Sequence, residues 1–198
     1  MAGMTRLTIR LLLLLALTAS SFAADSGTVR VLLKTELGDI ELELNRKAAP
    51  VTVANFLKYV NGGLYSSGVF HRTVTPNNQP RNKVKIEVIQ AGINPERRKD
   101  AFPPVPLERT TVTGLKHVNG AISMARDTPD SATSDFFICI GDQPELDFGG
   151  KRNPDGQGFA AFGRVMRGMD IVKKIQGSPA DGQKLTPPIR ILSAKVVR

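Results

Sequence analysis

The feature that most constrains the fold is a succession of short apolar runs that predict β-strands, with only two helical segments among them. The run Ile40-Glu41-Leu42-Glu43-Leu44 alternates strictly between apolar and charged residues, which is typical of a strand with one buried face. The predicted strands cover 29–35, 40–44, 69–74, 85–90, 120–125, 136–140, 160–165 and 189–197. Many short strands with so few helices favour a closed barrel that is capped at its ends.

Two amphipathic helices are predicted to form the caps. The first begins at Pro50 and ends before Gly62, with apolar residues at helical spacing between them. The second covers 169–175, and its apolar residues also fall on one face. The chain has no internal repeat and no linker, and its 198 residues are enough for one domain with a sizeable core.

A leader sequence is predicted at the start of the chain. Arg6 and Arg10 precede a short apolar run over 11–19, and Ser21-Phe22-Ala23 places small residues where a signal peptidase reads them. We therefore expect residues 1–23 to be a secretory signal peptide. The alternative is a membrane anchor, but the run is too short to span ~30 Å of hydrocarbon, so no stable membrane insertion is expected.

The remaining residues, 24–198, are expected to form a periplasmic or secreted domain. Cys139 is the only cysteine and lies within an apolar run, which predicts a buried strand residue and excludes an internal disulfide. The formal net charge is +9 for the whole chain. Because the basic residues are scattered and not clustered among aromatics, we expect no nucleic-acid partner. Contact with anionic envelope surfaces and simple solubility both remain open readings of this charge.

Four short motifs carry the functional signal, and they occur in a fixed order. They are Phe70-His71-Arg72, Val88-Ile89-Gln90-Ala91-Gly92, Ile122-Ser123-Met124-Ala125-Arg126 and Ser134-Asp135-Phe136-Phe137-Ile138, followed by Phe162-Gly163-Arg164-Val165 and Gly168-Met169-Asp170-Ile171-Val172. Together they resemble the cyclophilins, which are peptidyl-prolyl isomerases, over nearly the whole of the mature chain. The resemblance implies a mainly β fold, a closed eight-stranded antiparallel barrel capped by two helices. It also implies that the partners are proline-containing peptides and unfolded exported proteins.

Isomerisation of a prolyl peptide bond breaks no covalent bond and needs no nucleophile, metal or cofactor. When the amide twists, resonance is lost and the prolyl nitrogen gains a basic lone pair. A fixed cation with N–H donors can bind that nitrogen only in the twisted state, and arginine suits the task because it stays charged. The resemblance implies that Arg72 is this residue, that Gln90 orients Arg72 and the substrate carbonyl, and that Phe137 forms a wall of the proline pocket. Taken alone, Arg72 would be better explained as a surface or salt-bridging arginine at a strand end, and only the other motifs in order favour the catalytic role.

The resemblance also implies a set of substrate-binding residues. Met124 and Leu146 would complete the proline pocket, although apolar residues in such runs are often core residues. Ala125 and Arg126 match the family segment that binds the substrate main chain as an added strand. The full expected set is Phe70, Met124, Ala125, Arg126, Asp135, Leu146 and Phe159.

The chain departs from well-known cyclophilins beside the expected site. The segment between Arg72 and Gln90 is longer than the family norm, and Glu87 replaces an aromatic residue. Asp135 stands where many members have glutamine, and Phe159 stands near the place of a pocket histidine. The chain has no tryptophan, so the pocket-edge indole of many members is missing. The first two differences, the longer segment with Glu87 and the aspartate at Asp135, affect the expected substrate preference, not the reaction.

Other chemistries are less well supported by the sequence. His71 is expected to be a packed strand residue and His117 a loop residue, and neither is assigned a proton-transfer role. Asp147 and Asp155 lie in a Gly/Asn/Pro loop, but their spacing matches no known metal loop, so we expect no metal or cofactor. Two competing functions are a non-catalytic module that binds proline peptides and a secreted hydrolase, for which no Ser/His/Asp motif is evident. We expect a monomer.

Overall fold

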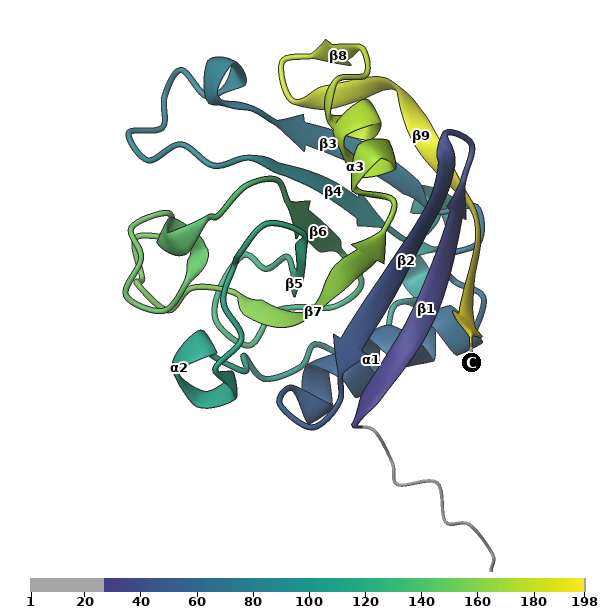
Figure 1. The fold of residues 1–198 in the computed structure, drawn as a ribbon, viewed down its shortest axis with the longest axis horizontal. Coiled ribbons are helices and arrows are strands. Elements are labelled where there is room, and N and C mark those ends of the chain that lie inside the picture. The colour runs from purple at the N-terminus through teal and green to yellow at the C-terminus, as the bar shows by residue number, and fades with distance from the viewer. Residues whose placement is uncertain (1–26, 198) are drawn as a thin grey trace, which may run out of the picture.

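Eight antiparallel strands close into a barrel in the computed structural model, which describes residues 27–197 (Figure 1). The strand order is β1-β2-β7-β5-β6-β4-β3-β9, and pairing between β9 and β1 closes the sheet. The barrel strands are β1 (Thr28–Thr35), β2 (Gly38–Asn45), β3 (Val69–Val74), β4 (Val88–Gly92), β5 (Ala121–Met124), β6 (Phe136–Cys139), β7 (Ala160–Arg167) and β9 (Lys184–Val197). The two-residue strand β8 (Ala180–Asp181) pairs only with β9. The expected eight-stranded antiparallel barrel is therefore confirmed.

The eight predicted strands are present, and two of them begin three or more residues away from the predicted position. Strand β4 begins at Val88, three residues later than predicted, because residues 85–87 belong to the preceding loop. Strand β9 begins at Lys184, earlier than predicted, and continues through Pro187 and Pro188. Both prolines lie where the register between β3 and β9 shifts, so their missing N–H groups cost no ladder hydrogen bond.

The two predicted helices cap the barrel. Helix α1 (Pro50–Asn61) and helix α3 (Met169–Gln176) pack apolar faces onto the barrel core, α1 at the lower end and α3 at the upper end in Figure 1. The N–H groups of Val51 and Thr52, in the first turn of α1, donate to the carboxylate of Glu108 (3.1 and 2.7 Å). The one-turn helix α2 (Thr110–Thr113) and the 3₁₀ turns at Pro76–Asn78, Pro95–Asp100 and Pro144–Leu146 were not predicted.

Strand alternation separates two hydrophobic clusters, one inside the barrel and one on its outer surface. In β6, Phe136 packs inside with the main core, whereas Phe137 and Cys139 pack outside. The outer cluster also contains Val88 and Leu146. Cys139 is fully buried, as predicted, and burial raises the pKa of its thiol. The outer cluster supplies an apolar base on the surface of the β3-β4-β6-β5 wall.

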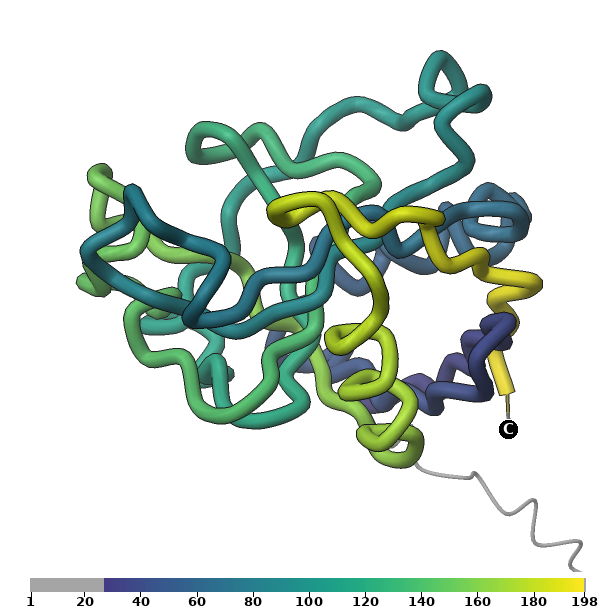
Figure 2. The backbone as a smooth tube through the Cα atoms, turned by 90° about the horizontal axis from the view of Figure 1, so that it is seen from above, coloured from purple at the N-terminus to yellow at the C-terminus, as the bar shows by residue number. Residues whose placement is uncertain are grey.

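Two long loops project beside this wall from the same end of the molecule. One is the 75–87 loop between β3 and β4, and the other is the 147–158 loop before β7 (Figures 1 and 2). The predicted signal peptide over residues 1–23 lies outside the described residues. Within residues 27–197, no helix is long and apolar enough to cross a membrane.

Candidate active site

A pocket of about 500 Å³ lies on the outer face of the β3-β4-β6-β5 wall, above the outer hydrophobic cluster. Eight of the ten predicted site residues line it. They are Arg72, Gln90, Ala125, Arg126, Asp135, Phe137, Leu146 and Phe159. The sequence motifs are far apart in the chain, and the barrel brings them together here.

The other two predicted site residues, Phe70 and Met124, lie in the barrel core and do not line the pocket. A β-bulge at His71 explains the position of Phe70. Phe70 pairs with Ala91 and Arg72 pairs with the adjacent Gln90, so His71 is an extra residue in β3. Without the bulge, Phe70 and Arg72 would face the same side of the strand; with it, Phe70 faces the core and Arg72 faces outward. Met124 points inward because strand side chains alternate and its neighbour Ser123 faces outward toward Phe137.

The guanidinium of Arg72 is held by two side-chain amides. Its Nη1 donates to Oε1 of Gln90 (2.9 Å), and its Nε and Nη2 both donate to Oε1 of Gln183 (2.9 and 2.7 Å). Burial lowers the pKa of Arg72, but guanidinium groups remain protonated in proteins. Arg72 is therefore a fixed cation whose partners are neutral. Sequence reasoning missed Gln183, which lies 111 residues away in the turn between β8 and β9.

An apolar half of the pocket is formed by Phe137, Leu146 and Phe159. The rings of Phe137 and Phe159 meet edge to face, with centroids 5.3 Å apart and an interplanar angle of 89°. Phe137 and Leu146 are almost fully buried, so they form the floor, and the half-buried Phe159 forms a side. This apolar corner beside Arg72 has the chemistry expected for holding a prolyl ring.

Behind Phe137 lies a buried hydrogen-bonded network centred on His117. The imidazole stacks on the Phe137 ring with centroids 5.9 Å apart, and it contacts Oδ1 of Asp147 (2.8 Å) and Oγ of Ser123 (2.9 Å). His117 lies in a loop as predicted, but it is buried and structural, which its sequence context did not indicate. Although Ser123, His117 and Asp147 are arranged like a hydrolytic triad, Ser123 is fully buried and cannot attack a substrate.

The aspartates that could have suggested calcium are engaged in other interactions. Asp147 is partly buried, which acts to raise its pKa, but the hydrogen bonds from His117 outweigh burial and hold the pKa below its usual value. Asp155 pairs with Arg126. Across residues 27–197, no group of three or more His, Cys, Asp or Glu side chains is placed to hold a metal ion.

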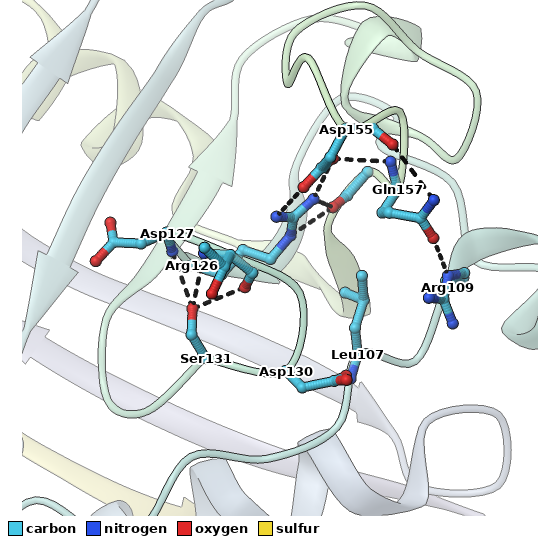
Figure 3. Close-up of polar contacts among 10 residues, drawn as sticks. Leu107, Arg109, Arg126, Asp127, Asp130, Ser131, Asp155 and Gln157 are labelled. Carbon is cyan, nitrogen blue, oxygen red and sulfur yellow. Dashed lines mark hydrogen bonds and ion pairs between the residues drawn. The ribbon is translucent and has the colours of Figure 1, made fainter.

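The side chain of Arg126 fixes the 147–158 loop (Figure 3). Its Nη1 and Nη2 donate to the two carboxylate oxygens of Asp155 (2.8 and 3.0 Å), and its Nε and Nη2 donate to the carbonyl of Gly158. Only 1% of the side chain is exposed, and the guanidinium lies 5.1 Å from the centre of the Phe159 ring. The side chain thereby holds Phe159 in place. The N–H of the adjacent Ala125 donates to the carbonyl of Asp135 (2.8 Å).

His71 and Asp135 lie at the edge of the site. Nε2 of His71 is 3.7 Å from Oδ2 of Asp135, and Nε2 of Gln90 donates to the same oxygen (3.5 Å). Burial lowers the pKa of His71, and the negative charge of Asp135 offsets this only in part. His71 is therefore neutral at pH 7 and is a packed strand residue, as predicted.

The 75–87 loop is ordered by a buried amide that sequence reasoning also missed. Nε2 of Gln79 donates to the carbonyls of Thr75 (2.7 Å) and Ile86 (2.8 Å). Nη1 of Arg152, from the 147–158 loop, donates to Oε1 of Gln79 (2.8 Å) and to the carbonyl of Val84 (2.7 Å). Arg152 thus ties the two loops together at the pocket rim, where it also lines the pocket.

The fold and the site together define a class: a closed antiparallel barrel with a pocket on its outer wall that combines an apolar corner with a fixed arginine. The comparisons with known proteins give the family. The model of the cyclophilin type peptidyl-prolyl cis-trans isomerase family matches residues 30–196.

Curated bacterial relatives match over most of their length. Peptidyl-prolyl cis-trans isomerase A of Dickeya dadantii is 38% identical, and the match covers 93% of both chains. Peptidyl-prolyl cis-trans isomerase B of Escherichia coli is 36% identical over 72% of this chain and 81% of the relative. A cyclophilin type isomerase of Cryptosporidium parvum shares the fold with a TM-score of 0.70 at 22% identity, covering 86% of this chain and 98% of that chain. The chain belongs to the cyclophilin family, and it is a peptidyl-prolyl cis-trans isomerase.

Proposed function

We propose that Arg72 accelerates prolyl isomerisation by donating a charged hydrogen bond to the prolyl nitrogen of the twisted amide. The barrier that must be lowered is ~18–20 kcal/mol and arises from amide resonance. A planar amide nitrogen is a poor acceptor, whereas the pyramidal nitrogen of the twisted state is a good one. The hydrogen bond therefore forms chiefly in the transition state, which is the condition for raising the maximal rate.

The observation that carries this proposal is the way Arg72 is held. Its three hydrogen bonds to Gln90 and Gln183 use three of the five guanidinium N–H groups and bring no carboxylate to the cation. The donors that remain stand beside the apolar corner formed by Phe137, Leu146 and Phe159. A prolyl ring in that corner would bring its nitrogen to the guanidinium. Because the arginine is already oriented, little reorganisation is needed during rotation.

The competing function is a binding module that holds proline peptides without turning them. A pure binder has no need for a cation aimed at the prolyl nitrogen, so the fixed Arg72 favours catalysis. Two-dimensional NMR exchange on a prolyl tetrapeptide separates the two functions. We expect exchange cross-peaks between cis and trans peptide at a sub-stoichiometric concentration of the chain. Line broadening without exchange between the isomers would support the binding module.

We further propose that the protein acts on unfolded exported proteins in the periplasm or outside the cell. The support is the start of the sequence, where Arg6 and Arg10 precede the apolar run over 11–19 and Ser21-Phe22-Ala23. Amino-terminal sequencing of the protein from the extracytoplasmic fraction tests this. We expect the mature chain to begin at Ala24 or within a few residues of it. A chain that keeps Met1 and sediments with membranes would contradict export in soluble form.

A further inference from the structure

Positive charge gathers at one end of the pocket. Arg72 and Arg152 both line it, Arg72 from β3 and Arg152 from the 147–158 loop. Burial lowers the pKa of Arg152, and the neighbouring charge of Arg72 lowers it further. Because both side chains line the same pocket of about 500 Å³, one bound peptide can lie within the field of both cations.

Neither guanidinium is neutralised by a carboxylate in the part of the chain that the structure describes. The Nη1 group of Arg152 donates to a side-chain amide and a main-chain carbonyl of the 75–87 loop, and the partners of Arg72 are amide oxygens. Arg126, which also lines the pocket, differs because Asp155 pairs with it on both carboxylate oxygens. The charges of Arg72 and Arg152 are thus available to a ligand.

Two carboxylates line the pocket, those of Asp127 and Asp135, and neither pairs with Arg72 or Arg152. The carboxylate of Glu145 accepts a hydrogen bond from the main-chain N–H of Lys151 (2.7 Å) and makes no ion pair with Arg152. Gln90 stands between Arg72 and Asp135, accepting from the first and donating to the second. The site is therefore polarised: Arg72 and Arg152 are cations without a paired carboxylate among residues 27–197, whereas at the His71 edge the charges of Asp135 and Arg98 oppose each other.

We propose that this polarity makes the isomerase selective for prolyl peptides that carry an aspartate or glutamate next to the proline, with Arg152 as the residue that sets the preference. A carboxylate on the bound peptide would lie in the field of two unpaired cations, whereas a lysine there would be repelled. This inference rests on the proposed function in one respect, that the prolyl ring occupies the corner beside Phe137. Opposite charges at such a partly exposed rim contribute to encounter and orientation more than to tight binding.

Peptide pairs of matched length test the proposal. In tetrapeptides with one proline, the residue before or after the proline is glutamate, glutamine or lysine, and kcat/KM is measured at low ionic strength. We expect the wild-type chain to favour glutamate over lysine by about three- to tenfold on at least one side of the proline. Because the Debye length falls to about 3 Å in 1 M salt, the glutamate-to-lysine ratio of kcat/KM should fall toward one there.

Three variants assign the preference to Arg152. Arg152→Gln should reduce the glutamate-to-lysine ratio to below about twofold, and Arg152→Lys, which keeps the charge, should restore most of it. Lys195→Gln removes the same charge from an exposed position on β9 outside the pocket and should leave the ratio unchanged. A wild-type ratio near one, or equal loss of the ratio in the Gln and Lys variants, would overturn the proposal. A wild-type chain that turns over none of the peptides, the glutamine controls included, would instead refute the proposed catalysis.

Discussion

Removal of the Gln183 side chain tests whether the orientation of Arg72 matters as much as its charge. In Gln183→Ala, Arg72 loses the acceptor of two of its three hydrogen bonds and keeps only the bond to Gln90. Hydrogen bonds to charged groups contribute about 1.5–3 kcal/mol, but water replaces part of this at a half-exposed site. We expect a loss of about 1–2 kcal/mol in transition-state stabilisation, which is roughly a 5- to 30-fold fall in kcat/KM.

The assay is peptide isomerisation with kcat and KM resolved, together with a thermal unfolding curve. The loss should fall mainly on kcat, because a free Arg72 side chain samples many rotamers and the hydrogen bond to nitrogen forms only in the twisted state. Gln176→Ala is the matched control. It removes an amide of the same type that donates to Glu87 (3.0 Å) and does not touch Arg72, and it should stay within twofold of wild type. Equal activity of Gln183→Ala and Gln176→Ala would show that the hydrogen bonds from Gln183 do not contribute to catalysis.

Three further predictions follow from the titrating groups and the loop backbone. The isomerisation rate should be nearly flat from about pH 6 to 9, because Arg72 stays charged and His71 has no proton-transfer role. Burial lowers the pKa of His71, so a steep step below about pH 6.5 in a pH–rate profile would implicate His71 instead. The pKa of Asp147 is lowered in the folded state, so the stability that its carboxylate contributes is complete above its unfolded pKa and is lost as the pH falls through its folded pKa. Asp147→Asn should therefore have a lower free energy of unfolding at pH 7 and a shallower dependence of stability on acid pH. Denaturant titrations measure both, and unchanged stability would contradict this. Gly158→Ala should destabilise the chain by about 1–3 kcal/mol, because the φ of Gly158 is +66° and a Cβ there would lie 2.5 Å from the carbonyl carbon of Asp147. Gly156→Ala is the control and should cost less, because Gly156 has a similar φ of +64° but open space where the Cβ would lie. Thermal unfolding compares the two variants.

Most of the barrel could be predicted because its signals are local. The alternation in 40–44 and the helical spacing after Pro50 depend on neighbours within a few residues, and both elements form where they were predicted. The start of β9 was missed because Pro187 and Pro188 normally break a strand, and only the shifted pairing with β3 makes room for them. A register shift of this kind depends on a partner strand that is distant in sequence.

The site residues also divide into those that local motifs predicted and those that only folding reveals. Motif order was enough to predict Arg72, Gln90 and Phe137, and the barrel brings all three to one pocket. The same motif misplaced Phe70, because the bulge at His71 depends on how β3 pairs with β4. Gln183 left no signal at all in the sequence. An isolated glutamine in a turn becomes significant only when folding places it against an arginine 111 residues away.

The buried network and the two loops show what motif order does not contain. His117 looked like an ordinary loop residue, yet it supports the Phe137 ring through contacts that need both Ser123 and Asp147 in place. Arg152 likewise connects the 75–87 and 147–158 loops through Gln79. His117, Asp147, Gln79 and Arg152 all lie outside the motifs, so motif order could not predict their contacts beside the pocket.

The steady-state kinetics of Arg72→Ala in residues 24–198 test directly whether Arg72 provides the hydrogen bond that accelerates isomerisation. We expect kcat to fall by about a hundredfold or more and KM to change by less than about threefold, because the lost hydrogen bond forms in the twisted state. The thermal midpoint should move by only a few degrees, because Arg72 lies outside the core clusters. Arg72→Lys should recover only part of the rate, since an ammonium group cannot bond to Gln90 and Gln183 and still keep a donor fixed toward the nitrogen. Full activity in a folded Arg72→Ala variant would show that Arg72 does not provide the catalytic hydrogen bond.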